Sequence, residues 1–123
     1  MNGDAIARTG LDVRDLEVDA DSPAEVFALV AGLFDTDPAL IAAALSEREA
    51  LASTDLDDEF AVPHADLDGL DHGVLVDVRL ARAVQWGPRQ VRRCFCVVTP
   101  PGHPDEHASL LAEAARRALG PTN

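Results

Sequence analysis

Two histidines in this sequence stand where an imidazole can take part in chemistry. His64 follows the apolar residues 60–62 and Pro63, which restricts the backbone, so we expect its imidazole at the end of a short strand. His107 falls in the first turn of the last expected helix, where backbone N–H groups and the helix dipole favour an anion. The pattern therefore predicts a nucleophile at His64 and, at His107, an imidazole that can hydrogen-bond a phosphoryl oxygen.

Arg48 and Thr54 have side chains that can bind an oxyanion. Arg48 lies near the C-terminal end of an expected helix, and its planar guanidinium can bind two phosphoryl oxygens at once. The Thr54 hydroxyl can donate to a third oxygen or orient the His64 ring. Without His64, we would interpret Arg48 as an exposed helix-end charge and Thr54 as a loop cap.

The other polar candidates carry less chemistry. His103 and His107 are four residues apart with acids between them, a spacing that resembles a metal pair, but Pro104 is expected to leave His103 outside the helix. His72, between Asp71 and Gly73, is interpreted as a turn residue with no role. A metal-binding α/β domain that uses His64, His103, His107 and nearby acids stays open as an alternative hypothesis, although phosphoryl chemistry on His64 needs no metal or organic cofactor.

The two cysteines are interpreted as structural. Cys94 and Cys96 are two apart in an apolar run, so a strand would place both thiols on one face, and we expect no disulfide between them. A second cysteine pair that would complete a zinc set is not present in the sequence. We therefore expect two buried thiols.

Composition narrows the class of protein. The chain has 123 residues, 47% of them hydrophobic, which is enough for one core and one domain. Its formal net charge of −12 argues against binding to nucleic acid, because it repels a phosphate backbone. Neither a membrane-spanning stretch nor a secretory signal is evident, so we expect a cytoplasmic protein without membrane insertion.

Apolar spacing predicts a mixed α/β domain over residues 11–120, preceded by a flexible start at residues 1–10. Ser22 with Pro23, and Asp37 with Pro38, predict the starts of two helices, the first ending near Asp35. Asp105 is expected to cap the last helix. The expected strands are an edge strand at residues 11–18, a short strand at 60–64, and two longer strands at 74–79 and 91–98, the last one the more buried.

Two ordered segments resemble a known family. Residues 48–54 read Arg-Glu-Ala-Leu-Ala-Ser-Thr, and residues 60–65 read Phe-Ala-Val-Pro-His-Ala. The resemblance continues at residues 84–86, Val-Gln-Trp, and at residues 107–111, His-Ala-Ser-Leu-Leu. In this order, the segments resemble the fructose/mannitol class of enzyme IIA, also called type 2 or nitrogen-regulatory, of the phosphoenolpyruvate-dependent sugar phosphotransferase system.

The resemblance implies a phosphoryl carrier with a mixed β-sheet flanked by helices. It implies that His64 accepts a phosphoryl group from a histidine phosphocarrier protein and passes it to a cysteine of a IIB domain or permease. Arg48, His107 and Thr54 would surround the phosphoryl group. Sugar selectivity in this family lies in the permease, so the resemblance names no sugar.

One loop departs from the family pattern. Where the family usually has glycines before the strand, this chain has Leu56, Asp57, Asp58 and Glu59. Glycines allow positive φ, and three carboxylates near an incoming phosphoryl group repel it, so activity could be reduced. The alternative interpretation is therefore a degenerate or regulatory IIA-like module that binds partners without efficient transfer.

Overall fold

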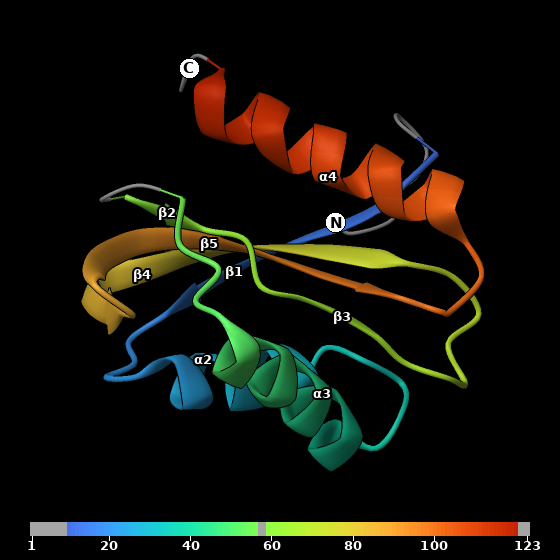
Figure 1. Cartoon of the computed structure of the whole chain (residues 1–123), viewed down its shortest axis with the longest axis horizontal. Coiled ribbons are helices and arrows are strands. Elements are labelled where there is room, and N and C mark those ends of the chain that lie inside the picture. The colour runs from blue at the N-terminus through green and yellow to red at the C-terminus, as the bar shows by residue number, and fades with distance from the viewer. Residues whose placement is uncertain (1–9, 57–58, 121–123) are drawn as a thin grey trace.

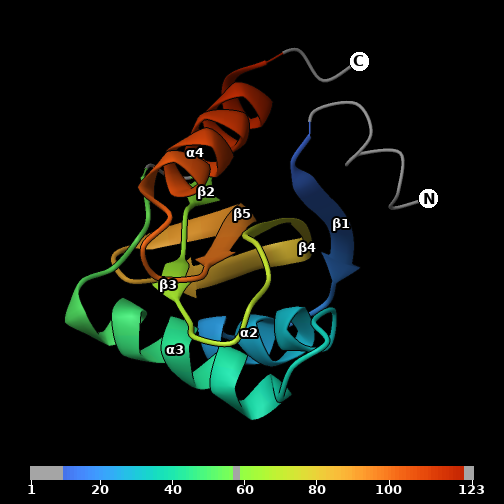
Figure 2. The ribbon, with the colours of Figure 1, turned by 90° about the vertical axis from the view of Figure 1, so that its right-hand side faces the viewer.

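The computed structural model describes residues 10–56 and 59–120, which form three layers. Figure 1 shows a sheet in the middle, with α4 covering one face and α2 and α3 covering the other. The view turned by 90° in Figure 2 shows the same layers from the side. The elements in chain order are β1 (Asp12–Val18), α2 (Pro23–Ala31), α3 (Pro38–Leu51), β2 (Phe60–Ala61), β3 (His64–Asp66), β4 (Val74–Trp86), β5 (Arg89–Thr99) and α4 (Pro104–Leu119).

The sheet is mixed, as the sequence predicts. The long strands β4 and β5 form an antiparallel hairpin at its centre, and β1 pairs with β4 in parallel at one edge. Strands β2 and β3 both pair with β5 in parallel at the other edge. The expected edge strand at residues 11–18 is thus confirmed as β1. The sheet register shifts between Arg79 and Val84, where β4 bends.

Both faces of the sheet are buried, which explains the nearly continuous apolar run of β5. Val76, Val78, Cys94 and Cys96 belong to the larger core, under α2 and α3. Leu75, Phe95 and Val97 point the other way and pack in the smaller core under α4, with Leu110 and Ala114.

The two cysteines are buried structural thiols, as predicted. Both are fully buried and reduced, with their Sγ atoms 4.0 Å apart. Burial raises the pKa of the Cys94 thiol well above its ordinary value, because the thiolate would lose its hydration there. Cys94 therefore stays protonated and behaves as a small apolar side chain.

Helices α2 and α3 begin where the sequence predicts. The Ser22 hydroxyl accepts the N–H of Glu25 at 3.2 Å, and the Asp37 carboxylate accepts the N–H of Ala39 at 3.0 Å. Glu25 reaches back to the N–H of Asp21 at 2.6 Å. Helix α2 ends at Ala31, however, earlier than the predicted end near Asp35. Residues 32–34 instead form a tight turn whose N–H groups bond three residues back, starting at Gly32, a poor helix former.

The last helix begins two residues earlier than predicted. Asp105 was expected to be the cap, but α4 starts at Pro104, and the cap position belongs to His103, which makes no side-chain capping bond. Proline suits the first helical position because its fixed φ is helical and its missing N–H would have no helical partner. Asp105 therefore lies inside the first turn, where its charge stabilises the helix dipole.

The expected short strand at residues 60–64 is divided in two. β2 ends at Ala61, and β3 begins at His64, so His64 opens a strand and does not end one. Pro63 lies between them and has no N–H to donate to the sheet, but its carbonyl still accepts the N–H of Val97 at 2.9 Å. The carbonyl of Val62, by contrast, points away from β5 at the sheet edge and is available to a side chain.

A buried carboxylate ties α4 to the sheet. Asp77 is fully buried on β4 and accepts two hydrogen bonds from Arg93, at 2.9 and 2.7 Å. Arg117 of α4 adds a third bond at 2.8 Å. Burial alone would raise the pKa of the Asp77 carboxyl, but the bonds and charges of Arg93 and Arg117 outweigh it and lower the pKa. Folding therefore favours the ionised carboxylate.

We predict that Asp77→Asn lowers the free energy of unfolding by about 2 kcal/mol at neutral pH. This lies below the range for fully buried pairs, because both arginines stay partly solvated. Since the folded pKa lies below the ordinary value of 3.8, the charge contributes above that value and its contribution is lost as pH falls through the folded pKa. Urea unfolding at several pH values should show the two proteins converging in acid.

The exposed pair between Asp19 and Arg82, at 2.7 Å, supplies the control. Asp19→Asn should change the unfolding free energy by less than about 1 kcal/mol, because solvent screens exposed pairs. Equal losses for Asp77→Asn and Asp19→Asn at neutral pH would contradict the importance given to the buried carboxylate.

Candidate functional site

The candidate site lies at the sheet edge formed by β3, between the two helix layers. His64 opens β3 opposite Val97 of β5, Arg48 comes from the last turn of α3, and His107 comes from the first turn of α4. The His64 and His107 rings stand edge to face, with centroids 5.9 Å apart. Three residues that the sequence predicted as a site, 59 positions apart at the extremes by their numbers, are therefore brought together by the fold.

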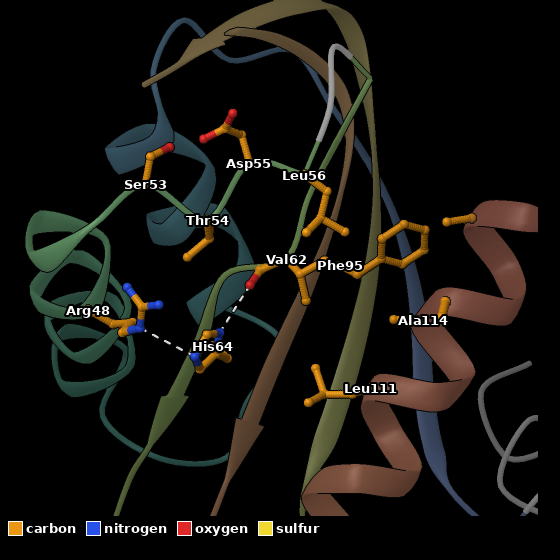
Figure 3. Close-up of a pocket in the computed structure, with 12 residues that line it drawn as sticks. Arg48, Ser53, Thr54, Asp55, Leu56, Val62, His64, Phe95, Leu111 and Ala114 are labelled. Atoms are coloured by element: carbon orange, nitrogen blue, oxygen red, sulfur yellow. Dashed lines mark hydrogen bonds between the residues drawn. The ribbon is translucent and has the colours of Figure 1, made fainter. Parts of the chain in front are cut away.

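Two hydrogen bonds determine the tautomer of the neutral His64 ring. Nδ1 lies 3.1 Å from the carbonyl oxygen of Val62, and Nε2 accepts a hydrogen bond from Arg48 Nε at 3.3 Å (Figure 3). A carbonyl oxygen can only accept, so the proton is assigned to Nδ1. The Nε2 atom therefore carries a lone pair, the form of an imidazole that acts as a nucleophile.

Arg48 is held in place from two sides. Besides the bond from Nε to His64, its Nη1 donates to the carbonyl of Ala52 at 2.9 Å, just beyond the helix end. These bonds use two of the five N–H groups of a guanidinium. The charge is therefore fixed beside the nucleophilic nitrogen, with further N–H groups on the same planar fork for an oxyanion.

Thr54 plays a different part from the one its hydroxyl suggested. It is buried, and its Oγ1 donates to Glu49 Oε1 at 2.6 Å, while its N–H donates to Glu49 Oε2 at 2.8 Å. Trp86 Nε1 donates to the same hydroxyl at 3.4 Å. The Thr54 hydroxyl thus donates its proton in a hydrogen bond to Glu49 and not to His64. The ring of His64 is oriented by the carbonyl of Val62.

Residues 53–55 are clamped by the tip of the β4–β5 hairpin. Gly87 has a φ of +58°, and a Cβ there would lie 2.4 Å from the Ser53 hydroxyl, so the turn needs glycine on both counts. Arg89 pairs with Asp55 at 2.8 Å. Sequence reasoning noticed Glu49 and Trp86 only as parts of the resembling segments and missed that together they hold this loop.

The His107 ring contacts a hydroxyl at the end of β5. Its Nδ1 lies 3.3 Å from Oγ1 of Thr99, the last residue of β5. The other two histidines lie elsewhere: His72 Nε2 bonds Asp12 at 2.9 Å, and His103 Nδ1 lies 3.9 Å from Glu106. Within residues 10–56 and 59–120, no group of three or more His, Cys, Asp or Glu side chains is arranged to hold a metal ion.

Two hollows flank His64. One, of about 410 Å³, is mostly apolar and lies between residues 53–56 and α4, with Leu111 and Ala114 on its far wall (Figure 3). The second, of about 480 Å³, opens between α3, β3 and α4, and its lining includes Arg48, His64, Asp66 and His107. His64 and Arg48 line both hollows, and the second one also contains the imidazole of His107 and the carboxylates of Glu47 and Asp66.

Only part of the acidic loop belongs to the described residues. Asp57 and Asp58 lie outside them. The carbonyl of Glu59 accepts the N–H groups of Arg92 and Arg93, at 3.0 and 3.1 Å, which ties the end of the loop to β5. Among the helices in the described part of the chain, none has the length and apolarity that crossing a bilayer requires.

Comparison with known proteins gives a consistent result. The model of the family described as "Phosphoenolpyruvate-dependent sugar phosphotransferase system, EIIA 2" matches residues 14–120. The nitrogen regulatory protein IIA-Ntr from Neisseria meningitidis is 23% identical, with a TM-score of 0.75 over 88% of this chain and 78% of its own. No curated protein matches the sequence.

Two structures from Escherichia coli share the fold as well. IIA mannitol is 20% identical, with a TM-score of 0.62 over 90% of this chain and 89% of its own. The enzyme IIA chain in a complex with phosphorylated enzyme IIB of the mannitol system is 19% identical, with a TM-score of 0.59 over 90% and 87%. At these identities, the structures establish the fold and leave the site to be argued from its own residues.

The two hydrogen bonds from Thr54 to Glu49 lead to a stability prediction. Glu49→Ala leaves the buried hydroxyl and N–H of Thr54 without their acceptor, so the free energy of unfolding should fall by about 1–3 kcal/mol. Glu49→Gln keeps one acceptor oxygen and should lose less. The measurement is urea unfolding, with the exposed Glu47→Gln on the same helix as the control. If Glu47→Gln lowered the free energy of unfolding as much as Glu49→Ala, the importance given to the bonds between Thr54 and Glu49 would be refuted.

Proposed function

Because the chain belongs to the EIIA 2 family of the phosphoenolpyruvate-dependent sugar phosphotransferase system, and is thus a phosphoryl carrier, we propose that Nε2 of His64 is the atom that carries the phosphoryl group. The observation behind this proposal is the pair of bonds to the ring. The Val62 carbonyl holds the proton on Nδ1, and Arg48 faces the lone pair on Nε2. The nucleophile is therefore already in the required tautomer and beside a fixed positive charge.

The proposed transfer moves one phosphoryl group between two imidazoles. The P–N bond of the donor phosphohistidine breaks, and its electron pair returns to the donor nitrogen. The lone pair of His64 Nε2 forms the new P–N bond, while the proton on Nδ1 stays hydrogen-bonded to the Val62 carbonyl. Because such transfer passes through a loose transition state, the protein acts mainly by positioning and by stabilising charge on the equatorial oxygens.

Arg48 and His107 are the proposed partners of those oxygens. Both line the second hollow beside His64, from opposite helix layers. When Nε2 bonds to phosphorus, the N–H of Arg48 that now donates to Nε2 can turn to a phosphoryl oxygen a bond length further out. Thr54 is proposed to support the site through Glu49, which holds the loop after α3.

The proposed donor is a histidine phosphocarrier protein, and the proposed acceptor is a cysteine of a IIB domain or permease. The complex of the similar mannitol enzyme IIA with phosphorylated enzyme IIB from E. coli supports the acceptor. The proposed location of this exchange is the cytoplasm, because the proposed chain of carriers begins with phosphoenolpyruvate. No sugar need contact the carrier, so the proposal names none.

The second candidate function is a partner-binding module that transfers phosphoryl groups poorly. It is favoured by the carboxylates at residues 57–59, where the family usually has glycines. Like charges near the incoming phosphoryl group raise its energy, and each carboxylate's effect falls with distance.

The direct test is intact-mass analysis after incubation with phosphoenolpyruvate, enzyme I and the phosphocarrier. We expect an acid-labile gain of one phosphoryl group, abolished by His64→Ala and retained by His72→Ala, which removes a histidine bound to Asp12 away from the site. Far-ultraviolet circular dichroism checks that each variant is folded. If the folded wild-type chain gains no mass, the carrier proposal fails and the binding-module interpretation is favoured.

The role of Arg48 is tested by the rate of transfer. Arg48→Ala removes the fixed charge and should lower kcat/KM for transfer from the phosphocarrier by about 10²-fold, comparable with loss of one donor to a developing oxyanion. Arg48→Lys keeps the charge without the planar fork, so its kcat/KM should lie between those of the wild type and Arg48→Ala. Rapid-quench measurements would contradict the role if Arg48→Ala transferred at the wild-type rate.

A further inference from the structure

A hydrogen-bonded chain connects His107 to a carboxylate through a buried hydroxyl. Thr99, 1% exposed at the end of β5, is the register partner of Asp66 at the end of β3. The Thr99 hydroxyl donates to Asp66 Oδ1 at 3.0 Å, and the same Oγ1 lies 3.3 Å from His107 Nδ1. Thr99 and Asp66 lie outside the segments that carry the family resemblance, which are residues 48–54, 60–65, 84–86 and 107–111.

The protons available to the hydrogen bonds from His107 through Thr99 to Asp66 determine the tautomer of His107. A carboxylate only accepts, and a threonine hydroxyl has one proton, which is directed to Asp66. Oγ1 must therefore accept from His107, so the Nδ1 atom carries the proton. In the neutral ring, Nε2 is then unprotonated and can only accept a hydrogen bond.

This tautomer restricts how His107 can meet a phosphoryl group. Phosphoryl oxygens are acceptors, so a neutral His107 with a bare Nε2 would present a lone pair to them. A ring protonated on both nitrogens instead presents an N–H and a positive charge. The opposite neutral tautomer, with the proton on Nε2, would have to give up the Nδ1–H bond to Thr99.

We propose that Thr99 is a positioning residue that holds His107 in the Nδ1–H tautomer, so that His107 binds the phosphoryl group on His64 only as an imidazolium. One proton from solvent adds to Nε2 of His107 when the phosphoryl group arrives, and it leaves when the group departs. The step makes or breaks no other bond, because the phosphoryl transfer itself is the P–N exchange described above. This inference rests on the proposed phosphoryl transfer to His64.

Charges around His107 come from every layer of the site. Asp66 and His64 lie on β3, Glu106 lies in the first turn of α4 next to His107, and His103 occupies the cap position of that helix. Glu47 and Arg48 on α3 line the same hollow. The carboxylates favour the added proton and Arg48 opposes it, so the phosphoryl group supplies the further negative charge that makes protonation favourable.

The test is ¹⁵N NMR of the histidine rings in the full chain across a pH titration. In the unphosphorylated wild type, we expect His107 to show a protonated Nδ1 and, at high pH, a bare Nε2. Thr99→Val keeps the shape and removes the acceptor, so the Nε2–H tautomer should become populated. Thr99→Ser keeps the hydroxyl and should restore the wild-type pattern.

The linked protonation is measured on the chain phosphorylated chemically with phosphoramidate, which needs no partner protein. His107 should stay protonated on both nitrogens to higher pH than in the unphosphorylated chain. In transfer assays, Thr99→Val should lower kcat/KM by about tenfold, the lower end of the loss seen when a partner that orients a metal-bound histidine is removed, and Thr99→Ser should recover it.

The outcomes separate this inference from the proposed function. An Nε2–H tautomer in the wild type, or a Thr99→Val spectrum identical to it, overturns the role of Thr99 even if His64 is phosphorylated. A phosphorylated chain in which His107 titrates as before overturns the linked protonation. Failure of His64 to react with either donor overturns the proposed function, and the tautomer of the unphosphorylated ring still decides whether Thr99 positions it.

Discussion

The hydrogen bond between His64 Nδ1 and the carbonyl of Val62 is the interaction on which the site depends. It exists because β2 and β3 form the edge of the sheet. The carbonyls of Glu59 and Pro63 accept N–H groups of β5, so the alternate carbonyl, that of Val62, points away from β5 and can accept from the side chain two residues on. This outward-facing carbonyl holds the proton on Nδ1 and leaves the lone pair of His64 on Nε2.

The layers of the fold bring the other groups to this nitrogen. The α2 and α3 layer delivers Arg48 at a helix end, and the opposite layer delivers His107 at a helix start. Each group has a second attachment that limits its freedom, Arg48 to the Ala52 carbonyl and His107 to Thr99. Pre-organisation of this kind reduces the reorganisation that transfer would otherwise need. The buried pair of Asp77 and Arg117 ties α4 to the sheet on the same face.

Sequence reasoning predicted the positions of the helices and strands better than the hydrogen-bond partners of individual side chains. Proline and cap residues predict the starts of α2 and α3, and alternation or continuity of apolar residues predicts β4 and β5. The site cluster of Arg48, His64 and His107 was also predicted, from motif and helix-end arguments. The start of α4 was missed because Pro104 takes the first helical position, which moves the cap to His103. The division at Pro63 was missed because strand pairing is decided by a distant partner, β5.

The hydrogen-bond partners could not be predicted from spacing. Thr54 reads as a free hydroxyl in the sequence, and only the fold shows that Glu49 and Trp86 occupy it. Thr99 and Asp66 are 33 residues apart and meet because β3 and β5 run parallel in register. Such contacts depend on tertiary packing, which a local pattern does not encode.

The most direct test of this account identifies which nitrogen of His64 bears phosphorus. Long-range ¹H–¹⁵N correlation with ³¹P coupling on the phosphorylated chain reads this atom without reference to rate or partner. The account predicts phosphorus on Nε2, with the proton still on Nδ1 at the Val62 carbonyl. Phosphorus on Nδ1 would contradict it, because that atom could react only after the Val62 bond had been broken.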